Sequence, residues 1–327
     1  MKYIYILTFL CSNIATSQTK INGLSFVASN REIADKAIVS VNQINANWVT
    51  LMPFAFMKNT SDTSIIYNDK RQWLGERKEG IEKTALAFHN KKIKIMLKPQ
   101  IWIPNGFTGH IKMKSESDWV KFERSYEIFI LDYAKLAQKT NCEIFCIGTE
   151  LNNFVMNRAE FWNKLILKIR KIYSGKITYA ENWDTYQNVS FLSDLDYIGI
   201  DAYFPLSAEK TPSIINLSKA WKPIKKEIKL FSKKLNKKVL FTEFGYQSQD
   251  FTAREPWDHN TKLAVNMIAQ ENALAIILAV FWKENWFEGG FLWKWYDNHE
   301  EVGGLNDADY TVQNKPAALI IKRFFKQ

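Results

Sequence analysis

Cysteine is scarce in this sequence, with three residues in a chain of 327. Cys11 lies in an apolar stretch at the N-terminus, and Cys142 and Cys146 lie four residues apart in the run CEIFCIG. If that run is a β-strand, the last two share a face but lie about 13 Å apart, which is too far for a disulfide. The fold therefore has to be held together by its hydrophobic core.

Long apolar stretches are also missing after the first residues of the chain. The segment NALAIILAVFWKENW is apolar over only about ten residues, whereas a membrane-spanning helix needs about 20. We therefore expect no transmembrane segment in the mature chain.

The N-terminus has the composition of a secretory signal peptide. A lysine and an apolar run are followed by the small residues Ala15 and Ser17, spaced as they are before a cleavage site. We expect residues 1–17 to be removed and residues 18–327 to form one exported domain, periplasmic or secreted and monomeric. A lipid anchor on Cys11 is the alternative, although the bulky residues just before it argue against this.

Histidine is scarce and scattered. None of the four histidines belongs to an H-E-x-x-H motif or to a pair with metal-ligand spacing; they are His89, His110, His259 and His299. A P-loop, a G-x-S-x-G elbow and a glycine-rich turn after the first strand-like run are missing as well. We therefore expect neither a metal nor a cofactor.

The net charge is positive, +10 for the whole chain and +9 once the signal peptide is removed with its single lysine. Much of this charge lies in the segment KPIKKEIKLFSKKLNKK, where apolar residues recur at helical spacing between the lysines. This pattern favours the solvated face of a helix over a binding surface. The sequence has no nucleic-acid-binding motif, so we expect no nucleic-acid partner.

Eight apolar runs recur along the chain. They are INGLSFVAS, NWVTLMPFAF, KIKIMLKPQIW, CEIFCIGTE, KITYAENW, YIGIDAYFP, KVLFTEFGY and GGFLWKWYDN. Helix-like amphipathic stretches lie between most of them, and Ser115 or Ser117 is suited to cap one of these. Strand and helix alternating eight times predict an α/β fold, a single (β/α)8 TIM barrel. An open doubly wound sheet is the alternative, which the missing glycine-rich turn disfavours.

In such a barrel the carboxyl ends of all strands meet at one face, where active sites form. Polar and aromatic residues follow most of the runs from the third onward: Gln100 and Trp102, then Glu150 and Asn152, Glu181, Asn182 and Trp183, Asp201 and Tyr203, Glu243 and Tyr246, and Trp293 and Trp295. Residues far apart in sequence are therefore expected to line one pocket.

Two of these acids have matching contexts, IGTEL around Glu150 and LFTEF around Glu243. They are 93 residues apart, or three units of 31, which assigns them to the fourth and seventh strands of a barrel. Two carboxyl groups suit hydrolysis of a glycosidic bond, because one protonates the leaving oxygen while the other attacks or stabilises the anomeric carbon. For either glutamate alone a helix cap or an ion pair is the simpler interpretation, but the matched pair favours catalysis.

The motifs FCIGTELNNF, ITYAENWD, DYIGIDAYFPL, VLFTEFGYQS and GGFLWKWYDN resemble glycoside hydrolase family 113, a family of retaining β-mannanases with a (β/α)8 barrel. The resemblance covers nearly the whole mature chain. It implies that Glu150 is the acid/base and Glu243 the nucleophile. It also implies that Trp293 forms the floor beneath the cleaved sugar.

The sequence departs from many related glycosidases just before the acid/base residue. They have an asparagine there that holds the sugar 2-hydroxyl, whereas this chain has Thr149. We expect Asn152 or Asn182 to make that contact instead.

Aromatic residues at the other strand ends complete the predicted substrate site. Trp102, Trp183 and Trp295 are candidates to stack on sugar rings, with core packing as the alternative. Trp295 has the strand parity of Trp293 and is expected to point the same way. Asp201 is included among the substrate-binding residues. Tyr203 and Tyr246 are expected to donate hydrogen bonds to the nucleophile, with packing as the alternative for Tyr246.

The expected substrate is a β-1,4-linked mannan, cut internally. A second hypothesis keeps the mechanism but changes the substrate to another β-linked polysaccharide or oligosaccharide. A third is a non-catalytic glycan-binding barrel, which the matched glutamates disfavour. A fourth makes Lys98 a Schiff-base lysine, although a lysine at this place is more often paired with a buried acid.

Overall fold

The computed structural model describes residues 19–259 and 263–326. The expected signal peptide and Cys11 lie outside the described residues. In the part of the chain that is described, no helix is both long and apolar enough to cross a membrane.

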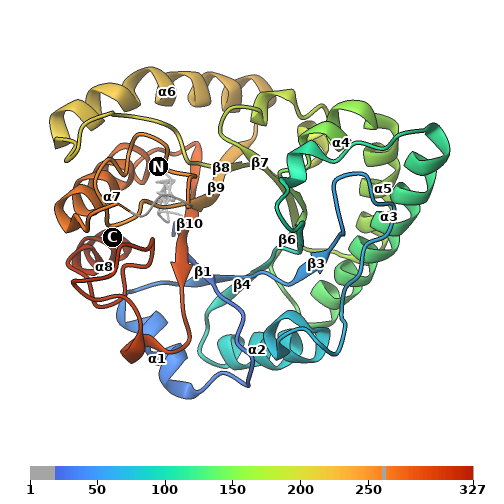
Figure 1. Cartoon of the computed structure of the whole chain (residues 1–327), viewed down its shortest axis with the longest axis horizontal. Coiled ribbons are helices and arrows are strands. Elements are labelled where there is room, and N and C mark those ends of the chain that lie inside the picture. Colours follow the sequence, from blue (N-terminus) through green and yellow to red (C-terminus); the bar gives the residue numbers. More distant parts are fainter. Residues whose placement is uncertain (1–18, 260–262, 327) are drawn as a thin grey trace, which may run out of the picture.

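Eight parallel strands close into a barrel that helices surround (Figure 1). Around the barrel the strand order is β1, β10, β9, β8, β7, β6, β4, β2. The strands are β1 (Ile21–Phe26), β2 (Trp48–Leu51), β4 (Lys94–Leu97), β6 (Ile144–Thr149), β7 (Lys176–Asn182), β8 (Tyr197–Asp201), β9 (Lys238–Phe244) and β10 (Phe287–Trp295). The predicted (β/α)8 barrel is confirmed.

The second and third apolar runs are each divided by a proline, Pro53 and Pro99. Proline has no N–H to donate to a ladder, so each run forms a barrel strand and then a separate short strand. The short strands, β3 (Phe54–Phe56) and β5 (Gln100–Trp102), pair in parallel as a two-stranded ribbon. The assignment of Trp102 to the end of a barrel strand is therefore wrong.

Helices follow most of the barrel strands. They are α1 (Asp35–Gln43), α2 (Lys78–Asn90), α3 (Glu116–Lys139), α4 (Asn152–Asn157), α5 (Ala159–Ile172), α6 (Ile214–Leu235), α7 (Met267–Phe281) and α8 (Ala317–Phe325). Ser115 caps α3, since its hydroxyl accepts a hydrogen bond from the Asp118 N–H. Two helices, α4 and α5, follow β6. Between β7 and β8 the chain forms only short 3-10 turns and no α-helix.

Two layers of apolar residues form the core. The large outer layer packs the strands against the helices, and a smaller inner cluster fills the barrel with residues such as Ile21, Met96 and Phe291. Cys146 belongs to the inner cluster and Cys142 to the outer one, and both are buried and free. The expectation that these two cysteines form no disulfide is confirmed.

Candidate active site

Glu243, near the end of β9, accepts hydrogen bonds from three side chains. The Lys98 ammonium lies 2.5 Å from Oε1, the Gln100 amide 3.2 Å from Oε1, and the Tyr203 hydroxyl 2.9 Å from Oε2. Lys98 and Gln100 come from the segment after β4, and Tyr203 comes from the segment after β8, so only the closed barrel brings all three to Glu243. They fix the orientation of the carboxylate and stabilise its negative charge.

Lys98 is fully buried and also contacts Asp201, with its Nζ 3.2 Å from both carboxylate oxygens. Burial alone lowers the pKa of Lys98, but the nearby Asp201 and Glu243 carboxylates together raise it above the ordinary lysine value. A Schiff-base lysine has to be neutral to attack a carbonyl carbon, so this environment does not suit that chemistry.

Asp201 is itself fully buried at the end of β8. Its carboxylate accepts a hydrogen bond from the Thr242 hydroxyl at 2.7 Å in addition to the two from Lys98. Burial and the neighbouring Glu243 raise the pKa of Asp201, whereas Lys98 lowers it. The prediction that Asp201 binds substrate directly is corrected, because its side chain has no solvent exposure. Its hydrogen bonds with Lys98 and Thr242 indicate that it positions Lys98 instead.

Glu150 directly follows β6 and has a left-handed backbone, with φ of 53°. Its N–H donates to the Ala180 carbonyl on β7 at 2.8 Å, and the residue is half-buried. Burial raises the pKa of Glu150 well above its ordinary value, and the negative charges of Asp201 and Glu243 raise it further. A carboxyl group that keeps its proton is suited to act as a general acid.

The strand-end residue Glu181 supports the backbone beside Glu150. Its carboxylate accepts hydrogen bonds from Tyr179, Thr185 and the Asn182 N–H, at 3.0–3.1 Å. The Tyr179 hydroxyl in turn accepts a bond from the Leu151 N–H at 2.8 Å. The sequence predicted that Glu181 lies at the pocket. It gave no sign that Glu181 is connected through the Tyr179 hydroxyl to the Leu151 N–H.

The two tyrosines predicted to contact the nucleophile differ. Tyr203 donates to Glu243, as expected. Tyr246 is buried, and among the described residues its hydroxyl has no hydrogen-bond partner. The predicted hydrogen bond from Tyr246 is therefore wrong. The Tyr246 ring packs in the core instead. Strand β9 ends at Phe244, so the alternation of side chains along the strand does not set the direction of Tyr246.

Trp293 and Trp295 also differ in their surroundings. Trp293 is half-buried. Its backbone lies beside the end of the strand that carries Glu243, because a Cβ added to Gly245 would stand 2.6 Å from the Trp293 carbonyl oxygen. Trp295 is buried, stacks on His299 and donates its indole N–H to Ser40 at 3.1 Å.

The prediction that Trp295 faces the substrate is corrected. The pairing of β1 with β10 shifts between Leu24 and Phe26, where β10 has one extra residue before Trp295. A β-bulge of this kind reverses the alternation of side chains that the parity argument assumed.

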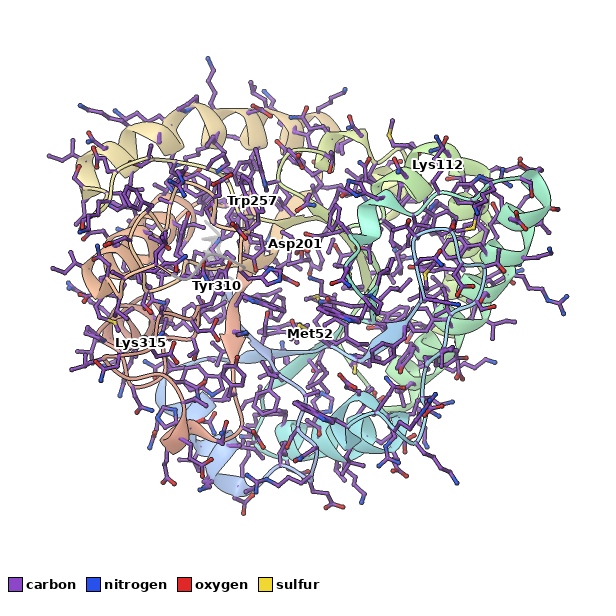
Figure 2. The ribbon with its side chains drawn as sticks, in the orientation of Figure 1. Met52, Lys112, Asp201, Trp257, Tyr310 and Lys315 are labelled. Carbon is purple, nitrogen blue, oxygen red and sulfur yellow. The ribbon has the colours of Figure 1, made fainter. Side chains whose placement is uncertain are left out.

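Trp183, the residue after β7, belongs to an aromatic cluster. Its ring stacks on Trp257 with 5.2 Å between centroids and contacts Phe204 at 5.7 Å. Trp257 is partly exposed and lies in the segment after β9, and its neighbour Pro256 accepts a hydrogen bond from Tyr310. Figure 2 shows Trp257 and Tyr310 on the side of the barrel that carries Asp201. Trp257 was not identified from the sequence as a candidate site residue. The only signal for it in the sequence was its position after the seventh strand.

Asn152 and Asn182 are both half-buried and flank the strand end of Glu150. Asn152 is the first residue of α4, and Asn182 ends β7, paired in register with Asp201. Neither side-chain amide has a hydrogen bond to another described residue, so both are available to a ligand. The described residues contain no group of three or more histidine, cysteine or acidic side chains that could hold a metal ion.

The barrel thus joins two glutamates with different environments: the pKa of Glu150 is raised, and Glu243 accepts hydrogen bonds from three donors. This arrangement on a closed parallel barrel defines a glycoside hydrolase. The model of Glycoside Hydrolase Family 113 matches residues 28–315, and the chain belongs to that family.

Solved structures agree with this assignment. The family 113 β-mannanase AaManA from Alicyclobacillus acidocaldarius, in complex with ManMIm, is 25% identical, with a TM-score of 0.82 over 95% of this chain and 98% of that one. A family 113 β-1,4-mannanase complex is 22% identical, with a TM-score of 0.83 over 94% and 99%. A Faecalibacterium prausnitzii β-glucuronidase shares the fold, with a TM-score of 0.63 and 12% identity, over 94% of this chain and 49% of its own. A comparison with curated proteins found no match.

Proposed function

We propose that this glycoside hydrolase cleaves β-1,4-mannosidic bonds within mannan-type polysaccharides and retains the anomeric configuration. The main support is the contrast between the two glutamates. The pKa of Glu150 is raised, and Glu243 accepts hydrogen bonds from Lys98, Gln100 and Tyr203. The choice of mannan rests on the similarity to a β-mannanase along nearly the entire chain.

In the first step Glu150 donates its proton to the glycosidic oxygen as the bond from that oxygen to the anomeric carbon breaks. A carboxylate oxygen of Glu243 bonds to the same carbon, which gives a glycosyl ester and releases the leaving sugar. In the second step water attacks the anomeric carbon and gives a proton to Glu150, and the ester bond to Glu243 breaks. Two inversions leave the configuration unchanged.

Other parts of the site are assigned supporting roles. Asn152 or Asn182 holds the sugar 2-hydroxyl, since Thr149 does not provide the usual asparagine. Trp293 lies under the sugar at the reaction centre, and the pair of Trp183 and Trp257 offers a stacking surface for another ring. We also propose that the mature chain is exported and acts as a monomer without a metal or cofactor.

The first experiment is product analysis of the purified protein on β-1,4-mannan, with Glu243→Ala alongside and a β-1,4-glucan as second substrate. We expect mannooligosaccharides from the wild type alone, with fresh products in the β configuration by NMR. Fresh α-anomers would contradict the retaining mechanism. Cleavage of glucan but not mannan would move the substrate to another β-glycan, and binding without cleavage of either would favour a non-catalytic barrel.

A further inference from the structure

The ribbon formed by β3 and β5 has one buried face and one open face. Ala55 and Ile101, in the middle of the two strands, are buried in the core. Their neighbours alternate to the other side, and in-register pairs in a sheet share a face. The open face is therefore made of Phe54 with Gln100 and Phe56 with Trp102.

This open face starts at the reaction centre. Gln100 donates a hydrogen bond to Glu243 at 3.2 Å, so its end of the ribbon lies against the nucleophile. Trp102 lies two residues farther along, a step of roughly 7 Å at the rise of a strand. Its ring packs edge-on against Phe54 and is 50% exposed. The face thus carries an aromatic surface away from Glu243 over a length comparable to a sugar ring.

A cavity of about 550 Å³ lies at the far end of this surface, within the size range of small-molecule binding sites. Phe56 lines it from the ribbon, and Ile66 and Trp73 line it from the segment between β3 and α2. Trp73 is 54% exposed. Exposed aromatic and aliphatic side chains around one hollow are typical of a ligand site.

The wall of the cavity is fastened to the ribbon. Phe56 and Ile66 exchange backbone hydrogen bonds at 2.8 and 2.9 Å. The Gln72 side chain donates to the Phe54 carbonyl and accepts from the Asp69 N–H, at 2.5 and 2.8 Å. These bonds hold the cavity in a fixed position relative to Glu243.

The edge of the cavity is polar and offers both hydrogen-bond donors and acceptors. Arg71 and Asp69 form a two-bond ion pair at 2.8 and 3.2 Å, and both line the cavity. Sugar hydroxyls need partners of both kinds, and the apolar faces of pyranose rings suit aromatic walls.

We propose that this cavity, with Trp73 as its main stacking residue, is a distal binding site for the β-linked glycan chain whose scissile bond lies at Glu243. The proposal rests on the proposed function and extends it: substrates long enough to cross Trp102 gain affinity that shorter ones lack. The enzyme then prefers polymers and long oligosaccharides.

The test compares kcat/KM on β-1,4-mannooligosaccharides from two to six units for the wild type, Trp73→Ala, Trp73→Phe and Leu319→Ala. Leu319 is a matched control, because it is an exposed apolar side chain on α8 outside the site. Trp73→Ala is expected to lose roughly tenfold on mannohexaose and nothing on the shortest cleaved substrate, with a smaller loss for Trp73→Phe. Equal losses at all lengths, or none on mannohexaose, would overturn the proposal.

A wild type that cleaves no mannooligosaccharide would defeat the proposed function but not the distal site. Gel retardation of the wild type and Trp73→Ala in galactomannan and in β-glucan then decides. Weaker retardation of Trp73→Ala in either gel supports a glycan site, and identical mobility of the two proteins in both gels rules it out.

Discussion

The ammonium of Lys98 lies 2.5 Å from the carboxylate of Glu243, although the two residues lie at the ends of barrel strands that are not neighbours. Lys98 follows β4 and Glu243 lies on β9, with β6, β7 and β8 between them. The lysine therefore reaches through the interior of the barrel to bind two acids at once. Its positive charge compensates the negative charges of Asp201 and Glu243 inside the barrel.

Lys98→Met is expected to destabilise the fold by about 3–5 kcal/mol, because it leaves Asp201 buried without its cation. Asp201→Asn in the same chain removes that uncompensated charge, so the double variant should be more stable than the sum of the two single changes predicts. Urea unfolding of the four proteins measures the coupling, expected at about 1–3 kcal/mol. Strictly additive effects would contradict the ion pair.

Tyr203→Phe removes one hydroxyl, which donates the 2.9 Å hydrogen bond to Glu243. A hydrogen bond to a charged group contributes about 1.5–3 kcal/mol, so kcat should fall roughly ten- to a hundredfold. Tyr246→Phe is the matched control, since its buried hydroxyl has no partner among the described residues. It should leave kcat unchanged and stability unchanged or slightly higher. Equal effects of the two changes would argue against the role of Tyr203.

The pH dependence of kcat/KM should show the raised pKa of Glu150. The acid has to be protonated, so activity is lost as pH rises through this pKa, and a raised value keeps activity to higher pH. Glu181 contributes one of the charges that raise it. Glu181→Gln should therefore move the basic limb to lower pH. Glu160→Gln, which removes an equal charge on the outer face of α5, should not move it.

The backbone of Glu150 allows a stability test separate from catalysis. Its φ of 53° is unfavourable for any residue with a Cβ and suits glycine. Glu150→Gly should be about 1 kcal/mol more stable than Glu150→Ala. Both should lose hydrolysis by a factor of roughly 100–10,000. Chemical denaturation compares the two, and a more stable alanine variant would contradict the strained backbone.

The sequence was sufficient for the barrel and for the family, because both depend on patterns that survive without coordinates. Alternating apolar runs indicated eight strands, and the spacing of Glu150 and Glu243 assigned them to the fourth and seventh. Both assignments to strands are confirmed by β6 and β9. The catalytic roles of the two glutamates stay predictions.

The errors have local causes that a periodic pattern does not reveal. Pro99 ended the third barrel strand early and moved Trp102 onto a ribbon. One extra residue in β10 turned Trp295 into the core. Tyr246 lies beyond the end of β9, where parity no longer sets direction.

The sequence by itself determined which residues are apolar, where the strands recur and which acids end them. Tertiary structure alone decided what those acids contact. Lys98 and Gln100 come from one unit, Tyr203 and Glu243 come from two others, and the four meet only when the barrel closes. It also decided that the pKa of Glu150 is raised, since burial and neighbouring charge set a pKa and neither is written in the local sequence.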